Sequence, residues 1–165
     1  MKCTFSRSDP ITMRVLAVDW GERRLGFAVS DETATIARPL GIVECGGDKA
    51  RKKAVREKLE ETGAGLVIVG LPLTLGGIEG ESAREARRFA GDLERSLDVP
   101  VRLVDERLTT SLAERLMRES NGRGRKKRGK KGEKKGGEKR RVDDLAASIL
   151  LQGYLDSGKN IPFDR

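Results

Sequence analysis

The chain has 165 residues, 36% of them hydrophobic but only 4% aromatic, and a formal net charge of +8 at pH 7. This length fits a single domain with a largely aliphatic core. Because the sequence contains no histidine, it excludes Ser-His-Asp and Cys-His nucleophiles, nucleases with a histidine acid or base, and zinc sites that need histidine.

The cysteines and the hydrophobic pattern indicate a soluble, cytoplasmic protein. Cys3 and Cys45 are too few for a disulfide framework or a four-cysteine zinc site, so we expect reduced thiols. No apolar stretch approaches the roughly 18 residues of a membrane helix, and the chain does not begin with a signal-peptide apolar block. We expect residues 1–12 to be a disordered leader, residues 13–157 a single domain and residues 158–165 a C-terminal tail.

Two apolar runs near the start of the domain predict a hairpin. Residues 14–20 and 25–31 have the length and composition of strands, and residues 21–24 between them predict a tight turn. A third strand is expected near residues 40–44. The three runs together predict an antiparallel meander.

Helices and strands alternate after the meander. Residues 49–62 carry apolar side chains at helical spacing and end at Gly63. Residues 66–70 form a continuous apolar run, which is typical of a strand covered on both faces. Ser82 and Glu85 match a capping box that would begin the next helix. The apolar stripe of this helix consists of Ala83, Ala86, Phe89, Ala90, Leu93 and Leu97.

The last third of the chain predicts one more strand and two helices. Residues 99–104 predict a strand, Thr109 or Thr110 would cap a helix, and a last helix would run from Asp143 to about Leu155. An early meander followed by alternating helices and strands predicts an α/β fold. Its mixed sheet would be covered by helices on both faces.

The basic excess of the chain is confined to residues 121–141. This segment holds 12 Lys and Arg against 2 Glu, a net charge of +10, whereas the other 144 residues have a net charge of −2. Its glycines and charges predict a flexible loop that suits a polyanion such as nucleic acid. A solvated insertion without function is the alternative. The expected nucleic-acid contacts are Arg125, Lys126, Lys127, Arg128, Lys130 and Lys131.

Acidic residues adjoin three of the apolar elements. Asp19 ends the first predicted strand, Asp105 and Glu106 follow the last one, and Asp143 and Asp144 begin the last helix. Sites in such sheets form beyond the carboxyl ends of the strands, so we expect these acids to converge. Two carboxylates about 4 Å apart repel by roughly 4 kcal/mol at an effective dielectric near 20. Oxygen ligands select hard cations, so the cluster predicts bound Mg²⁺ or Mn²⁺, which in pairs can promote phosphodiester cleavage without histidine.

Each of these acids also has a purely structural explanation. Asp19 could accept hydrogen bonds from turn amides, and Glu106 could pair with a neighbouring arginine. Asp143 and Asp144 could be the N-cap and a first-turn acid of the last helix. Helical periodicity does not decide which of these two faces the core, because both share a face with apolar residues.

Four motifs follow one another along the chain. They are Asp19-Trp20-Gly21, Val69-Gly70-Leu71-Pro72-Leu73, Asp105-Glu106-Arg107-Leu108-Thr109-Thr110 and Val142-Asp143-Asp144-Leu145-Ala146-Ala147-Ser148-Ile149-Leu150-Leu151. In this order they resemble the bacterial YqgF/RuvX family over residues 13–156. The resemblance implies a ribonuclease H-like fold with a mixed five-stranded sheet. The family is described as pre-16S rRNA nucleases and, under an older name, as Holliday-junction resolvases.

The resemblance implies a metal-dependent nuclease whose catalytic and metal-binding triad is Asp19, Glu106 and Asp143. Asp143 is preferred because the family pattern is Asp, a small residue, an apolar residue and two alanines, with Asp144 in the small-residue position. The implied role is cytoplasmic maturation of the 5′ end of 16S rRNA during ribosome biogenesis. We expect Trp20 to pack within the protein rather than to stack on bases.

Other functions are compatible with the sequence. The same acids could cleave four-way DNA junctions, an activity that usually needs a symmetric dimer, so the chain is expected to be a monomer or a homodimer. A non-catalytic RNA-binding assembly module would need only the basic segment. An Asp-x-Gly hairpin also begins the actin-like kinases and ATPases, but this chain is too short for their two lobes.

Overall fold

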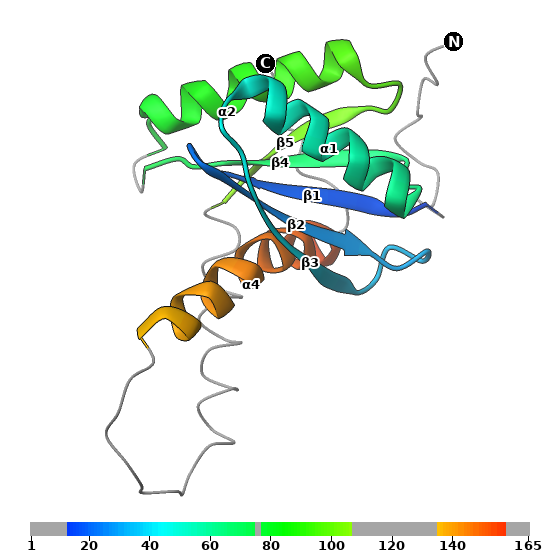
Figure 1. The fold of residues 1–165 in the computed structure, drawn as a ribbon. Coiled ribbons are helices and arrows are strands. Elements are labelled where there is room, and N and C mark those ends of the chain that lie inside the picture. Colours follow the sequence, from blue (N-terminus) through cyan, green and yellow to red (C-terminus); the bar gives the residue numbers. More distant parts are fainter. Residues whose placement is uncertain (1–12, 75–76, 107–134, 158–165) are drawn as a thin grey trace, which may run out of the picture.

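The computed structural model describes residues 13–74, 77–106 and 135–157, with the backbone alone described for residues 135–144. Five strands form one sheet in the order β3-β2-β1-β4-β5 (Figure 1). β2 runs antiparallel to β1 and β3, whereas β4 runs parallel to β1 and β5. The predicted meander and mixed sheet are therefore confirmed. The strands are β1 Val15–Trp20, β2 Arg24–Ser30, β3 Ala37–Glu44, β4 Leu66–Leu71 and β5 Val101–Asp105.

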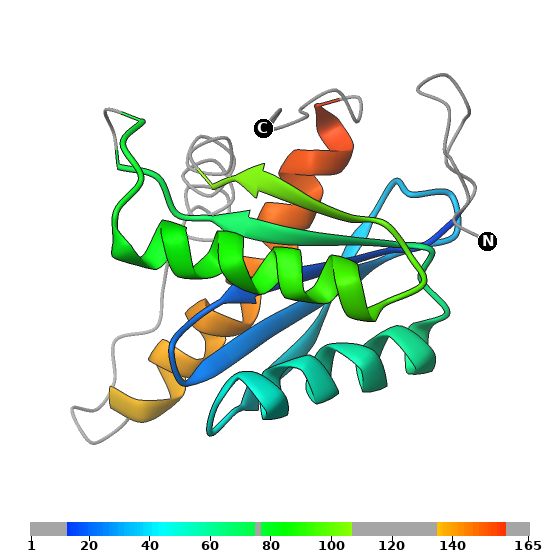
Figure 2. The same ribbon diagram turned by 90° about the horizontal axis from the view of Figure 1, so that it is seen from above.

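Helices cover both faces of this sheet, as the sequence predicts. The helices α1 (Asp48–Thr62) and α2 (Glu81–Ser96) lie on one face, and α4 (Lys135–Asp156) lies on the other. Figure 1 shows α1 and α2 above the sheet and α4 below it, and Figure 2 shows the same layers from above. The helix predicted from Thr109 or Thr110 falls outside the described residues.

The alternation of side chains along β1 builds a core on each face. Leu16, Val18 and Trp20 pack with α1 and α2, whereas Val15 and Ala17 pack with α4. β1 is the middle strand, and its neighbour β4 is buried at every position, as its continuous apolar run predicts. The parallel strands β1, β4 and β5 all end at one edge of the sheet, called the carboxyl edge below.

The predicted starts of β3 and α2 are wrong for physical reasons. β3 begins at Ala37 rather than near Leu40 and includes Pro39, which an edge strand tolerates because its outer N–H needs no partner. The capping box predicted at Ser82 does not form, because α2 begins at Glu81 and Gly80 is its N-cap, with no side-chain cap. The apolar stripe predicted for this helix is buried from Ala83 to Leu93, as expected.

Helix α4 begins at Lys135 rather than at Asp143. Residues 135–141 of the basic segment are therefore helical and not loop, while residues 121–134 lie outside the described part of the chain. Lysine and arginine are good helix formers, and the C-terminal half of α4 packs against the sheet, so the helix can extend through them. Within the described residues, no helix is long and apolar enough to cross a membrane.

Candidate active site

Asp19 lies on the α4 face of the sheet, close to the end of β1. A Cβ atom at Gly26, its register partner on β2, would lie 3.4 Å from the Cβ of Asp19 and 3.6 Å from the Cβ of Ala147 on α4. Side chains alternate along a strand, so Asp19 lies on the same face as Val15 and Ala17, which pack with α4. The side chain of Asp19 therefore lies beside Gly26 of β2, on the face of the sheet that α4 covers.

Glu106 reaches the same face from the end of β5. Its N–H donates a 3.3 Å hydrogen bond to the carbonyl oxygen of Leu71, which continues the pairing of β4 with β5 by one residue. A Cβ atom at Gly70 would lie 2.5 Å from Oε1 of Glu106 and 3.1 Å from a methyl carbon of Leu150 on α4. The carboxyl group of Glu106 therefore occupies the space above Gly70.

The two acids are close enough to repel each other. Burial of the Glu106 carboxyl group, followed by the negative charges of Asp19 and Asp105, raises its pKa to about 7 from an ordinary value of 4.5. Asp105 is itself buried, and by strand alternation it belongs to the opposite face, with Leu103. The convergence of Asp19 and Glu106 predicted from the sequence is thus present at the carboxyl edge.

The third predicted acid lies on the helix that covers these two. Position 143 belongs to α4 and lies one helical turn before Ala147, the residue next to Asp19 across Gly26. The side chains of Asp143 and Asp144 are outside the described part of the chain, as are the predicted nucleic-acid contacts from Arg125 to Lys131. Among the residues whose side chains are described, no group of three His, Cys, Asp or Glu residues could hold a metal ion.

The described carboxylates nevertheless have the chemistry of a cation site. Both donors are oxygen atoms, the ligand type that Mg²⁺ and Mn²⁺ prefer. Burial, and after it the negative charges of Asp19 and Asp105, raise the pKa of Glu106, and a cation would favour the ionised carboxylates. Asp19 and Glu106 therefore fit a divalent cation, provided that further ligands complete its coordination.

Two glycines belong to this site and were not singled out by the sequence analysis. Gly26 and Gly70 each lie in a strand next to one of the carboxylates. A Cβ atom at Gly70 would collide with Glu106, whereas one at Gly26 would make ordinary van der Waals contact with Asp19. A signal for Gly70 exists in the sequence, because glycine inside a buried β-branched strand often marks a close approach of another group.

A family model and two relatives of this chain carry nuclease descriptions. A family model described as "RuvX: Holliday junction resolvase" matches residues 13–157. A protein of Anaeromyxobacter sp. (strain Fw109-5) named "Putative pre-16S rRNA nuclease" is 42% identical over 144 residues, which is 87% of this chain and 97% of that protein. A protein of the same name from Chloroflexus aurantiacus is 38% identical over 148 residues, 90% of either chain.

A solved structure supports the same fold. The RuvC of T. thermophilus in complex with Holliday junction substrate matches with a TM-score of 0.57 and 19% identity, over 92% of this chain and 99% of that chain. Identity at this level shows the fold alone. The predicted ribonuclease H-like architecture is therefore confirmed.

We expect Gly70→Ala to destabilise the protein by about 1–3 kcal/mol, because the added methyl group collides with Glu106 and Leu150. In a Glu106→Ala background the cost should shrink, since the carboxyl group is gone. Urea unfolding of the four proteins measures this coupling. Gly91→Ala is the control, because a methyl group there meets only Arg95, at 3.7 Å. A coupling energy of zero would contradict the geometry.

The raised pKa of Glu106 predicts a pH dependence of stability. Between pH 4.5 and about 7 the folded protein holds a proton on Glu106 that the unfolded chain has lost. The free energy of unfolding should therefore fall as the pH rises through this window, by as much as roughly 3 kcal/mol without metal, and level off above it. Glu106→Gln lacks this contribution. Unfolding curves that shift equally with pH in both proteins would refute the prediction.

Proposed function

The chain belongs to the RuvX family, and from this premise we propose that it is a metal-dependent nuclease that matures the 5′ end of pre-16S rRNA in the cytoplasm. The observation that carries the proposal is the meeting of Asp19 and Glu106 on the α4 face of the carboxyl edge. Groups whose pKa is shifted by burial and by a neighbouring charge cluster at functional sites. A nuclease gives these carboxylates such a function, because its cation would offset their charge.

The proposed ligands are Asp19, Glu106 and Asp143. β1 and the β4–β5 pair hold the first two on sheet backbone, which fixes ligands better than a loop does. Helix α4 would bring the third, from the turn before Ala147. When bound, Mg²⁺ or Mn²⁺ supplies a Lewis acid that activates water and stabilises the leaving oxygen in phosphodiester hydrolysis, with one ion or with two.

The basic segment, residues 121–141, supplies the positive charge that an anionic substrate needs near this acidic site. A phosphodiester substrate is an anion, and the acids at the carboxyl edge repel it until positive charge is nearby. Residues 121–141 carry a net charge of +10 and run into α4, the helix that packs beside Asp19. We assign Arg125, Lys126, Lys127, Arg128, Lys130 and Lys131 to phosphate contacts that hold the substrate without reading bases.

Cleavage of four-way DNA junctions is the second candidate, because the matching family model is described by that activity. RNA is favoured because the relatives named for pre-16S rRNA share 38–42% identity with this chain. The RuvC likeness, by contrast, carries only the fold. A junction resolvase makes two cuts and usually works as a symmetric dimer, so a strictly monomeric protein in solution would weigh against that candidate.

Asp19→Asn and Glu106→Gln should each lower the rate of Mn²⁺-dependent cleavage by about 10²-fold or more, because each removes a ligand charge. The assay uses RNA that spans the 5′ end of 16S rRNA, with a four-way DNA junction in parallel. Asp98→Asn is the matched control, an exposed acid before β5 at the opposite edge of the sheet. The nuclease proposal fails if neither substrate is cut or if Asp19→Asn cuts as fast as the wild type.

Replacing the six basic residues from Arg125 to Lys131 by serine should weaken RNA binding and flatten its salt dependence. The slope of log K against log salt should lose up to about 4 in magnitude, since each single-strand phosphate contact contributes about 0.7. The substitutions leave helix α4, which begins at Lys135, intact. An unchanged slope would remove the proposed role of this segment.

A further inference from the structure

The register pairs of β1 with its two neighbouring strands end at different residues. Parallel pairing of β1 with β4 ends at Val18, which pairs with Val69. Antiparallel pairing with β2 continues through Asp19 and Trp20. The last two residues of β1 therefore lie beyond the register pairs with β4, where groups packed against the β1–β2 hairpin can add restraint.

Trp20 is packed against a cation from helix α1. Its side chain is 9% exposed and belongs to the core on the α1 and α2 face, opposite to Asp19. The guanidinium carbon of Arg51 lies 5.5 Å from the centroid of the indole ring, within the range of a cation–π interaction. The prediction that Trp20 packs within the protein is thus confirmed.

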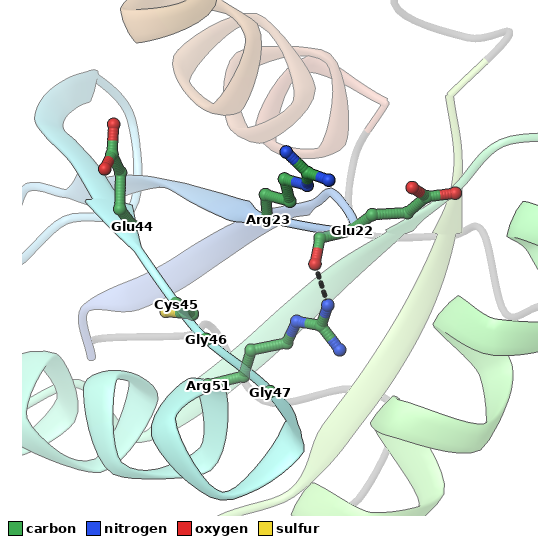
Figure 3. Close-up of a pocket in the computed structure, with 7 residues that line it drawn as sticks. All are labelled: Glu22, Arg23, Glu44, Cys45, Gly46, Gly47 and Arg51. Carbon is green, nitrogen blue, oxygen red and sulfur yellow. Dashed lines mark hydrogen bonds between the residues drawn. The ribbon is translucent and has the colours of Figure 1, made fainter.

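Arg51 also holds the turn that follows Trp20. Its Nη2 donates a hydrogen bond to the main-chain carbonyl oxygen of Glu22 (Figure 3). In that view Arg51 extends from α1 beneath the turn, in a pocket lined by residues of the turn, the end of β3 and the start of α1. One side chain therefore touches both the last residue of β1 and the turn beyond it.

Arg51 is itself held in place. Its Nη1 lies 2.7 Å from Oδ1 of Asp48, and its side chain is only 12% exposed. The other oxygen of Asp48 accepts a 3.0 Å hydrogen bond from Arg88 of α2. A long side chain fixed by a carboxylate, an indole and a carbonyl has few rotamers left, so it can restrain the groups that it touches.

We infer that Arg51 is a positioning residue for Asp19. Successive side chains of a strand face opposite sides of the sheet, so Trp20 faces α1 and Asp19 faces α4. By holding the indole of Trp20 and the carbonyl of Glu22, Arg51 restrains the backbone that orients Asp19. The ligands of a metal site must be held to about 0.5 Å, and Arg51 adds a restraint just after the last register pair of β1 with β4. The inference rests on the proposed function for its catalytic consequence.

The first test uses the metal-free protein. Native-state hydrogen exchange in residues 18–24 should become about tenfold faster or more in Arg51→Met, with β4 unchanged. Arg56→Met is the matched control, because Arg56 is on the same helix and also donates to a carbonyl, that of Ser96 at 3.1 Å. Exchange that rises equally throughout the sheet would show that Arg51 only stabilises the fold, and would overturn the inference.

The second test measures Mn²⁺ affinity by calorimetry and RNA cleavage. Arg51→Met should weaken Mn²⁺ binding by about 10–100-fold, as loss of a residue behind a ligand typically does, and lower kcat with little change in KM. Arg51→Lys should recover part of the loss, because an ammonium group can lie near Trp20 but cannot also bond Asp48 and Glu22. Arg56→Met should match the wild type. An unchanged Mn²⁺ affinity in both Arg51 variants would overturn the inference.

The two tests separate this inference from the proposed function. If wild type and Asp19→Asn bind Mn²⁺ equally and neither cuts RNA, the proposed metal site fails. Hydrogen exchange then still decides whether Arg51 holds the peptide of Asp19. If Arg51→Met does not fold, Arg51→Lys replaces it in the exchange experiment. We then expect a smaller acceleration of exchange, confined to residues 18–24. Acceleration that is uniform or absent would count against the inference.

Discussion

The burial of the Glu106 carboxyl group beside the negative charge of Asp19 is the constraint on which the carboxyl edge depends. Burial and neighbouring charge raise the pKa of Glu106 to about 7, so the ionised pair costs the metal-free fold free energy. Such local cost is typical of sites where activity takes precedence over stability. The cores on both faces of the sheet provide the stability that lets the fold retain this pair.

The fold concentrates this charge through its topology. Parallel strands end at one edge, and the meander brings β2 back beside β1, so two carboxylates from distant parts of the chain meet on one face. Gly70 leaves space for the carboxyl group of Glu106, Gly26 lies beside Asp19, and Ala147 and Leu150 of α4 adjoin these two glycines. Small residues on the strands and apolar residues on the helix therefore define the volume in which the carboxylates lie.

The sequence predicted the parts of this arrangement that depend on local pattern. Alternation and continuous apolar runs located the strands, and the position of acids at strand ends located Asp19 and Glu106. The starts of α2 and α4 were wrong, because packing and neighbouring residues extend helices past local signals such as Ser82. The role of Asp143 stays a prediction, since its side chain is outside the described residues.

Contacts between distant segments could not be predicted in this way. Nothing local in the sequence indicates that Arg51 would lie over Trp20, because the pairing depends on how α1 returns across the sheet. The same holds for the closeness of Gly70 to Glu106, which separate elements bring about. Periodicity identifies which face of an element is buried, but it does not identify the partner that buries it.

The position of the Trp20 indole, at the end of β1, has a practical consequence. Trp20 is the only tryptophan of the chain, and it adjoins Asp19 in the sequence and Arg51 in space. The tryptophan fluorescence of the protein therefore comes from a single side chain, which directly follows Asp19 in the sequence. Changes at the carboxyl edge can therefore be followed by tryptophan fluorescence in the unlabelled protein.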